Sequence, residues 1–155
     1  MLNEFRVCSV SLNYLHGVVP SVEVKGEFSL PDPYYNNLYQ FDVCEVFHCD
    51  GLLLCIDEYC TRIVVWNPCT GQKRWMQTRH GHKQNEYYAL GSYQDSKAGD
   101  KSYKILCYWG YMIDKGFEIY EFNSNSWRVL DATPDCNLEC IDNGKFLKGK
   151  GYWIA

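Results

Sequence analysis

Short apolar runs separated by turn residues recur along most of the chain, and this pattern favours β-strands. The runs are five to seven residues long, and they alternate in polarity or are rich in β-branched and aromatic residues, as strands are. Gly, Pro, Asn and Asp stand in many of the gaps, where turns need them. Two sets of four strands are predicted: residues 43–49, 52–56, 62–66 and 72–76, then residues 87–93, 103–109, 117–122 and 126–130.

The two sets repeat each other. The pairs Trp66-Asn67 and Phe122-Asn123 end the third strand of each set and lie 56 residues apart. Each Asn opens a turn that leads into a strand with a tryptophan, Trp75 or Trp127. A repeat of about 50 residues with four strands is typical of the blades of kelch-type β-propellers.

We therefore predict an all-β fold, a partial kelch-like β-propeller. Residues 1–155 would form one partial domain, with lead-in strands in residues 1–33 and blades in residues 43–76 and 87–130. The start of a third blade would occupy residues 144–155. No segment has helical periodicity, and residues 134–142 have room for one helical turn at most.

Charge and hydropathy exclude several classes of partner. The net charge is −4, whereas proteins that neutralise nucleic-acid phosphates carry a basic stripe, so we expect no nucleic-acid partner. The longest uninterrupted apolar run, residues 52–56, is far shorter than the roughly 20 residues of a membrane span. Residues 1–6 carry charges where a signal peptide is apolar. We expect an intracellular protein, in the cytoplasm or nucleus, with no membrane partner.

Nine cysteines raise the question of a metal site. No two of them form a C-x2-C pair, although structural zinc sites usually present close ligand pairs. His80 and His82 add nitrogen ligands without a matching motif. The number of cysteines is odd, and several lie within apolar runs. We expect reduced, mostly buried thiols, with no metal and no cofactor.

The sequence also offers no catalytic centre. His48 and Cys49 are adjacent, and neighbouring residues in a strand point to opposite faces, so they cannot form a nucleophile–base pair locally. The acidic residues are spread through turns, and residues 149–151 (GKG) are followed by no helix that would bind a phosphate. We expect no catalytic residue and no enzyme activity.

Several segments resemble a known family. Residues 48–55 (HCDGLLLC), followed by residues 65–71 (VWNPCTG), resemble the F-box-associated domain of plant F-box proteins. Residues 103–106 (YKIL), 117–120 (FEIY) and 125–128 (NSWR) resemble the same domain, and residues 149–155 look like its next blade. The resemblance covers the chain from about Val7 to its end. It implies a kelch-type propeller whose loops capture a protein substrate for an SCF-type ubiquitin ligase.

The motif residues of this resemblance are expected to be structural: Cys49, Asp50, Gly51, Trp66, Asn67, Pro68, Gly71, Trp75 and Trp127. Partner contact is expected instead from exposed loop aromatics and from one cation: Tyr34, Tyr35, Tyr111 and Arg79. Tyrosine is enriched at interaction hot spots. The cation belongs to a basic stretch that would form either a solvated loop or a patch for an acidic partner segment: Lys73, Arg74, Arg79, His80, His82 and Lys83.

The predicted function is a non-catalytic protein-interaction module that binds a protein substrate of unknown identity. The helical F-box that docks the Skp adaptor is absent from the sequence, and the last predicted blade is incomplete, so we expect a truncated relative that does not bind the adaptor. Unclosed blades leave strand edges and faces bare, so the isolated chain is expected to be poorly stable. Three alternatives stay open: a truncated product without full function, a small-ligand or carbohydrate-binding β-module, and a cysteine enzyme.

Overall fold

The computed structural model describes most of the chain, namely residues 7–13, 19, 21–36, 39–57, 61–78, 86–94, 99, 101–111, 114–132, 145–147 and 150–152. Within these residues the chain forms twelve strands and one 3-10 helix. The elements are β1 (Val7–Asn13), β2 (Ser21–Phe28), η1 (Pro33–Tyr35), β3 (Val43–Cys49), β4 (Leu52–Asp57), β5 (Arg62–Trp66), β6 (Lys73–Gln77), β7 (Glu86–Gln94), β8 (Lys101–Tyr111), β9 (Asp114–Glu121), β10 (Ser126–Leu130), β11 (Lys145–Leu147) and β12 (Lys150–Tyr152).

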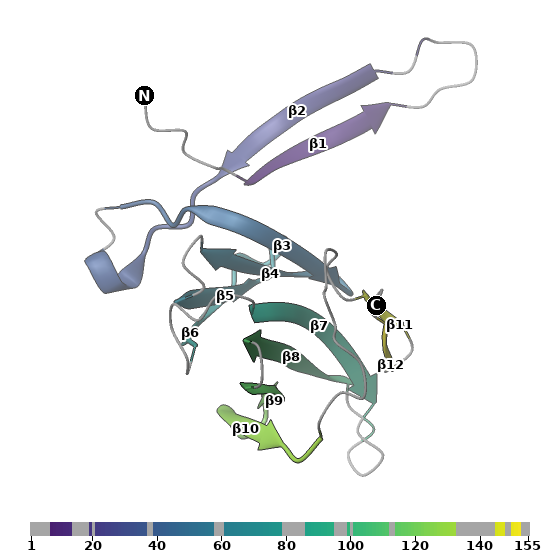
Figure 1. The fold of residues 1–155 in the computed structure, drawn as a ribbon. Helices are drawn as coiled ribbons and strands as arrows, with labels where there is room; N and C mark the ends of the chain where they lie inside the picture. Colours follow the sequence, from purple (N-terminus) through teal and green to yellow (C-terminus); the bar gives the residue numbers. More distant parts are fainter. Residues whose placement is uncertain are drawn as a thin grey trace.

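Two four-stranded antiparallel sheets form the centre of the molecule (Figure 1). Strands β3 to β6 make sheet one and strands β7 to β10 make sheet two, and in each sheet the strands follow one another in chain order. The all-β fold and its partial propeller architecture are thus confirmed. The eight strands predicted for the two sets all form, and their ends differ from the prediction by at most three residues.

The first strands of successive units lie side by side. Strand β7 contacts β3 of the preceding sheet on one side and β11 of the following hairpin on the other. In a propeller the innermost strands of the blades meet in this way around the axis. The strands β3, β7 and β11 therefore hold the inner position, and each sheet extends outward from it.

The pairing registers of the two sheets show the internal repeat. Trp75 on β6 pairs with Val64, two residues before Trp66. Trp127 on β10 pairs with Tyr120, two residues before Phe122. Each tryptophan thus has the same place in its sheet, as the spacing predicts.

Trp75 and Trp127 also lie on the equivalent face of their sheets. We call the back face of a unit the face turned toward the unit before it. The back face of sheet one carries Val46, Leu53, Cys55, Val64, Trp66 and Trp75, and that of sheet two carries Tyr88, Leu90, Ile105, Tyr120 and Trp127.

The main core lies between the two sheets. Sheet one contributes Phe47, Leu54, Ile56, Ile63, Val65 and Met76, which pack against Tyr88, Leu90, Ile105, Cys107 and Tyr120 of sheet two. A second core covers the back face of sheet one, where Leu30, Phe41 and Val43 pack on Cys55, Val64 and Trp66. Burial of one Leu or Ile contributes roughly 1.5–3 kcal/mol, so both faces of sheet one stabilise the fold.

The hairpin β1–β2 projects from the body of the molecule (Figure 1). It occupies the predicted lead-in region, and its strands pair antiparallel with a register shift between Ser9 and Val10. Val7 and Phe28, at the base of the hairpin, pack against the back face of sheet one. The rest of β2 is exposed, so only the base of this hairpin belongs to a core.

Two expectations from the sequence need correction. Of the six cysteines that the structure describes, only Cys55 and Cys107 are buried, Cys49 is half-buried, and three are exposed (Cys8, Cys44 and Cys69), so the expectation of mostly buried thiols is wrong for this part of the chain. Cys8 lies at an outward-facing position of β1, Cys44 lies at the register shift in β3, and Cys69 lies in a turn. Tyr34 and Tyr35, which were expected in a loop, lie in the helix η1.

Within the described residues, no helix has the length and apolar character that crossing a bilayer requires.

Truncation of the inter-sheet core should destabilise the chain strongly. Leu54 is 0% exposed, and Leu→Ala changes at such sites cost about 2–5 kcal/mol because they lose apolar burial and leave a cavity. We expect this loss for Leu54→Ala in urea unfolding. The exposed Val129 of β10 is the control, and Val129→Ala should change the free energy of unfolding by less than about 0.5 kcal/mol. Equal effects of the two variants would contradict the assigned core.

Candidate protein-interaction surface

A short turn around η1 carries the candidate surface, and its own sequence explains its shape. Asp32 caps the helix, and its Oδ1 accepts a hydrogen bond from the Tyr34 amide at 2.9 Å. Pro33 follows at the first helical position, where its fixed φ suits the turn. Asn36 ends the helix at a φ of 52°, a conformation that Asn tolerates better than most residues. These features make a defined turn rather than an irregular loop.

Backbone bonds close the loop that contains this turn. The amide of Asp32 donates to the carbonyl of Tyr39 at 2.9 Å, and the amide of Phe41 donates to the carbonyl of Leu30 at 2.8 Å. Leu30 and Phe41 are both 1% exposed and belong to the second core. The two ends of the loop are therefore fixed on sheet one.

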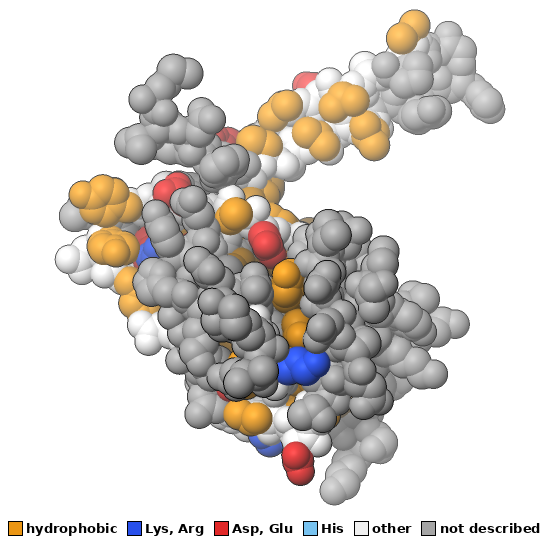
Figure 2. Space-filling view, in the orientation of Figure 1, with side chains coloured by type: hydrophobic (Ala, Val, Ile, Leu, Met, Phe, Trp, Pro, Cys, Tyr) orange, Lys and Arg blue, Asp and Glu red, His pale blue; other side chains and the backbone are white. Residues whose placement is uncertain are grey.

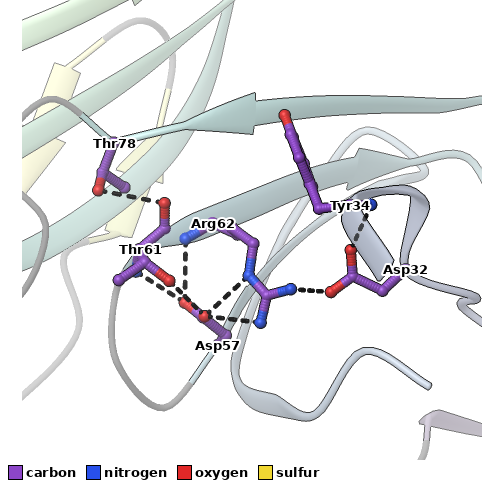
Figure 3. Close-up of polar contacts among 6 residues, drawn as sticks. All are labelled: Asp32, Tyr34, Asp57, Thr61, Arg62 and Thr78. Carbon is purple, nitrogen blue, oxygen red and sulfur yellow. Dashed lines mark hydrogen bonds and ion pairs between the residues drawn. The ribbon is translucent and has the colours of Figure 1, made fainter. Parts of the chain in front are cut away.

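Arg62 fastens the turn to sheet one (Figure 3). Its Nη1 forms an ion pair with Oδ2 of Asp32, and its Nη2 lies 3.3 Å from Oδ2 of Asp57 at the end of β4. Asp32 and Asp57 are 1% and 3% exposed. Burial lowers the pKa of Arg62 because desolvation disfavours its charged form, but a guanidinium remains protonated at neutral pH. One cation thus pairs with two buried carboxylates.

Asp57 is further held by the start of the next strand. Its Oδ1 accepts from the amides of Thr61 and Arg62 at 2.8 and 3.1 Å, and its Oδ2 accepts from the Thr61 hydroxyl at 2.7 Å. The Thr61 carbonyl in turn accepts from the Thr78 amide at 3.2 Å. It also accepts from the Thr78 hydroxyl at 3.4 Å, the bond drawn in Figure 3. The carboxylate that receives Arg62 therefore has a fixed position.

The guanidinium also contacts two rings. Its central carbon lies 5.3 Å from the ring centre of Tyr35 and 5.7 Å from that of Phe41. These are cation–π distances. Tyr35 in turn meets the ring of Tyr39 edge-on at 5.8 Å.

Three exposed tyrosines surround this anchor: Tyr34, Tyr35 and Tyr39, which we call the tyrosine patch. Their exposed fractions are 47%, 55% and 65%. Figure 2 shows hydrophobic side chains gathered at the place of η1. The patch consists of large rings on a turn that is fixed from below, an arrangement typical of a protein-contact surface.

Two of the predicted contact residues, Tyr34 and Tyr35, are exposed as expected and lie in this patch. Tyr111 is the last residue of β8 and pairs with Asp114, so its placement in a loop is wrong. The alternation of polarity in residues 103–109 stops before it, and the strand continues because the β8–β9 hairpin is long. Arg79 lies outside the described residues. Tyr39, which the sequence analysis missed, completes the patch.

The motif residues Asp50 and Gly51 form a turn that links the two sheets. Their φ values of 50° and 83° are those of a type I′ hairpin turn. Asp50 Oδ2 lies 2.8 Å from Lys101 Nζ and accepts a hydrogen bond from the Ser92 hydroxyl, both on sheet two. The hydrogen bonds from Lys101 and then Ser92 lower the pKa of Asp50 to about 2.

The motif from Trp66 to Gly71 builds the turn between β5 and β6. Trp66 is buried on the back face, edge-on to Phe28 with ring centres 4.7 Å apart. Asn67 Oδ1 accepts from the amides of Cys69 and Thr70, and the Asn67 carbonyl accepts from the Gly71 amide at 2.8 Å. Gly71 has a φ of 75°, which favours glycine.

Two other motif tryptophans join the cores. Trp75 packs edge-on against Phe41, with ring centres 5.1 Å apart. Trp127 packs on the inter-sheet core, and its Nε1 donates to the Gln77 carbonyl of sheet one at 3.3 Å.

Part of the predicted basic stretch serves the fold. Lys73 donates to the Ser29 carbonyl at 3.2 Å, and Arg74 donates to the Phe122 carbonyl at 3.1 Å while covering its ring. The other members, residues 79, 80, 82 and 83, lie outside the described residues. The described lysine and arginine thus connect sheet one to its two neighbouring segments.

The thiol chemistry of the strand end at Cys49 is unfavourable for catalysis. Burial is the largest cause that raises the pKa of Cys49, and a raised pKa leaves less of the nucleophilic thiolate. The neighbouring His48 Nε2 accepts a hydrogen bond from the Gly51 amide at 3.1 Å. Burial also raises the pKa of Cys55 to about 12.

No group of three or more His, Cys, Asp and Glu side chains with metal-binding geometry occurs in the part of the chain described.

Comparison with known proteins gives one consistent result. The sequence model of the F-box associated beta propeller domain matches residues 1–155. A probable F-box protein of Arabidopsis thaliana is 51% identical over all of this chain and 36% of its own length. An F-box/kelch-repeat protein of the same plant is 43% identical over all of this chain and 40% of its own length.

A further F-box protein of Arabidopsis thaliana is 46% identical over 87% of this chain and 58% of its own length. The chain therefore spans between about a third and three fifths of the length of these relatives. No solved structure matches the chain.

Removal of Arg62 should destabilise the chain because it leaves two buried carboxylates without their cation. We expect Arg62→Met to lower the free energy of unfolding by about 3 kcal/mol, the cost of breaking a buried ion pair. The control is Arg128→Met, since Arg128 is 59% exposed in its ion pair with Glu121 and such pairs contribute less than about 1 kcal/mol. Urea unfolding measures both, and a loss for Arg62→Met no larger than the control's would contradict the anchoring role.

The Asp50 link should make stability depend on acid. Asp50 has a pKa of about 2 in the folded chain, below its ordinary 3.8, so its contribution is fully present above pH 4 and is lost as the pH falls through 2. Asp50→Asn keeps a residue that tolerates the positive φ. We expect wild type to melt at a higher temperature than this variant at pH 5 to 7, and the difference to shrink between pH 4 and pH 2. A difference that does not change with pH would contradict the link.

Proposed function

The chain belongs to the F-box associated beta propeller family, and from this premise we propose that it is a non-catalytic module that binds a protein substrate of an SCF-type ubiquitin ligase. The Arabidopsis thaliana relatives described above are named as F-box proteins, which supports an assignment to the ubiquitin ligase system. Ubiquitin transfer would be carried out by other subunits. The proposed place of action is the cytoplasm or the nucleus, where this system works.

The tyrosine patch is the observation that carries the proposal. Tyr and Arg are enriched among the residues that contribute most to protein–protein binding. Tyrosine supplies a large contact area for the loss of only two side-chain torsions. Because the Asp32–Arg62–Asp57 anchor and the backbone bonds of the loop fix the turn, little further ordering is needed on binding.

We further propose a division of labour along the chain. Residues 43–76 and 87–130 would act as two blades, residues 1–33 as lead-in strands and residues 144–155 as the start of a third blade. The turn with the tyrosine patch leads from the lead-in hairpin into the first blade. Substrate contact, and not contact with the Skp adaptor, would be the contribution of these 155 residues.

A substrate-capture experiment tests the patch. Tyr34→Ser/Tyr39→Ser removes two of its rings and keeps Tyr35, which covers Arg62. Proteins captured from plant extract by the wild type should be depleted at least tenfold with this variant. They should remain with Val129→Ser, which changes an exposed residue of β10.

Each captured protein is then purified and titrated against the same three chains, since direct binding is required. Circular dichroism verifies that the variants are folded. A captured protein that binds the double variant as tightly as the wild type would overturn the role of the patch. Direct recovery of the Skp adaptor by the wild type would overturn the proposed division of labour.

A further inference from the structure

The two hairpins at the ends of the described chain are complementary halves of one blade. Strand β11 lies beside β7, in the inner position, and β12 pairs with β11. The β11–β12 hairpin therefore matches the first two strands of a four-stranded sheet. The hairpin β1–β2 comes immediately before β3, as β5–β6 comes before β7, so it matches the last two strands. Its packing agrees with this position: the pair Val7–Phe28 covers sheet one as the pair Ile63–Met76 covers sheet two.

The back face of the β1–β2 hairpin is bare and apolar. Alternation along β1 turns Val10 and Leu12 away from the face that carries Val7. The register places Val24 opposite Val10 and Val22 opposite Leu12, so the four side chains form one stripe. They are between 55% and 70% exposed, and Figure 2 shows hydrophobic side chains along the projecting hairpin. In sheets one and two, by contrast, back-face side chains such as Trp66 and Tyr88 are buried against the preceding unit.

A second bare position lies on sheet one itself. Val46 of β3 is on the back face and is 45% exposed. Tyr88 and Leu90, on the back face of the equivalent strand β7, are 1% and 3% exposed because sheet one covers them. The hairpin β1–β2 covers the outer part of sheet one only. The inner two strands of a blade are missing in front of β3 among the described residues.

We propose that a second copy of this chain completes both half-blades, so that two copies join head to tail in a closed ring. Strand β12 of one copy would pair with β1 of the other and form the four-stranded order β11-β12-β1-β2. In a blade built this way the chain directions alternate from strand to strand, as they do in sheets one and two. The same contact, made twice, closes a two-fold ring.

The strand count fits this closure. One chain supplies twelve strands in its described residues, so two chains supply enough for six four-stranded blades, within the roughly four to eight of known propellers. The stripe of Val10, Leu12, Val22 and Val24 would then cover the outer strands of the partner's sheet two. The inner strands of the completed blade would cover Val46. The stripe and Val46 are thus buried by the same contact.

Charge favours the same pairing. Strands β11 and β12 contain two lysines and no acidic residue, whereas strands β1 and β2 contain two glutamates and one lysine. The two halves of the proposed blade therefore carry opposite net charges, which favours pairing between different halves over pairing of like with like.

The mass in solution is the first test. Light scattering on the purified 155-residue chain should give twice 18.1 kDa at micromolar concentration. Leu12→Asp places a charge on the bare stripe, at a side chain that is 70% exposed in the single chain, and should reduce the mass to that of one chain. The control Val129→Asp changes an exposed valine outside the proposed contact and should leave the dimer intact. A folded wild-type monomer, or a larger open oligomer, would overturn the proposal.

Cross-linking tests the orientation. In the completed blade β12 and the partner's β2 are two strand spacings apart, about 10 Å. An amine-reactive cross-linker on an equimolar mixture of ¹⁴N- and ¹⁵N-labelled chains should therefore join Lys150 of one copy to Lys25 of the other in mixed-isotope peptides. A dimer without these peptides would overturn the head-to-tail arrangement. The tyrosine patch plays no part in either test, so its failure and the failure of this ring are distinguishable.

Discussion

Sheet one of this chain is apolar on both faces, and this one constraint explains most of the structure. A sheet of that kind cannot face water on either side, so it must be covered by a neighbour before it and a neighbour after it. Sheet one satisfies the requirement with sheet two on one face and with the base of the β1–β2 hairpin, Leu30 and Phe41 on the other. The fold is therefore a row of units that cover one another, and the exposed stripe of Val10, Leu12, Val22 and Val24 lies at the β1–β2 end of the row.

The ion pairs of Arg62 with Asp32 and Asp57 add to this apolar packing, and their effect is to orient the turn. Replacement of a buried ion pair by well-packed apolar side chains is often neutral or stabilising, so net stability alone does not account for two buried carboxylates. The geometry does. Phe41 and Leu30 fix the ends of the loop by apolar contact, which is not directional, whereas Asp32 binds both Arg62 and the Tyr34 amide. The carboxylate thus sets the orientation of the turn that carries the tyrosine patch.

Patterns among neighbouring residues predicted the fold well. They did not predict the contacts between residues that are distant in the sequence. The Asp50-Gly51 turn, the strand periods and the 56-residue spacing are properties of neighbouring residues, and the strands formed within three residues of their predicted ends. Arg62 and Asp32 are thirty residues apart, and no local pattern links them. Tyr39 joins the patch only because the backbone bond from Asp32 brings it back beside Tyr35. The burial of a given cysteine depended in the same way on which sheet face it reached.

The two surfaces of this chain differ in what they require of a partner. The β1–β2 stripe is a flat strand surface with an open edge, and such an edge accepts any strand of suitable direction; its specificity must come from the shape of the half-blade beside it. In the tyrosine patch, the amides of Tyr34 and Tyr35 and the carbonyl of Tyr39 are bonded within the loop. The exposed rings are therefore what the patch offers to a partner. The proposed chain assembly and the proposed substrate recognition therefore rest on different chemistry, main-chain pairing at one place and aromatic contact at the other. A change in either surface can occur without loss of the other.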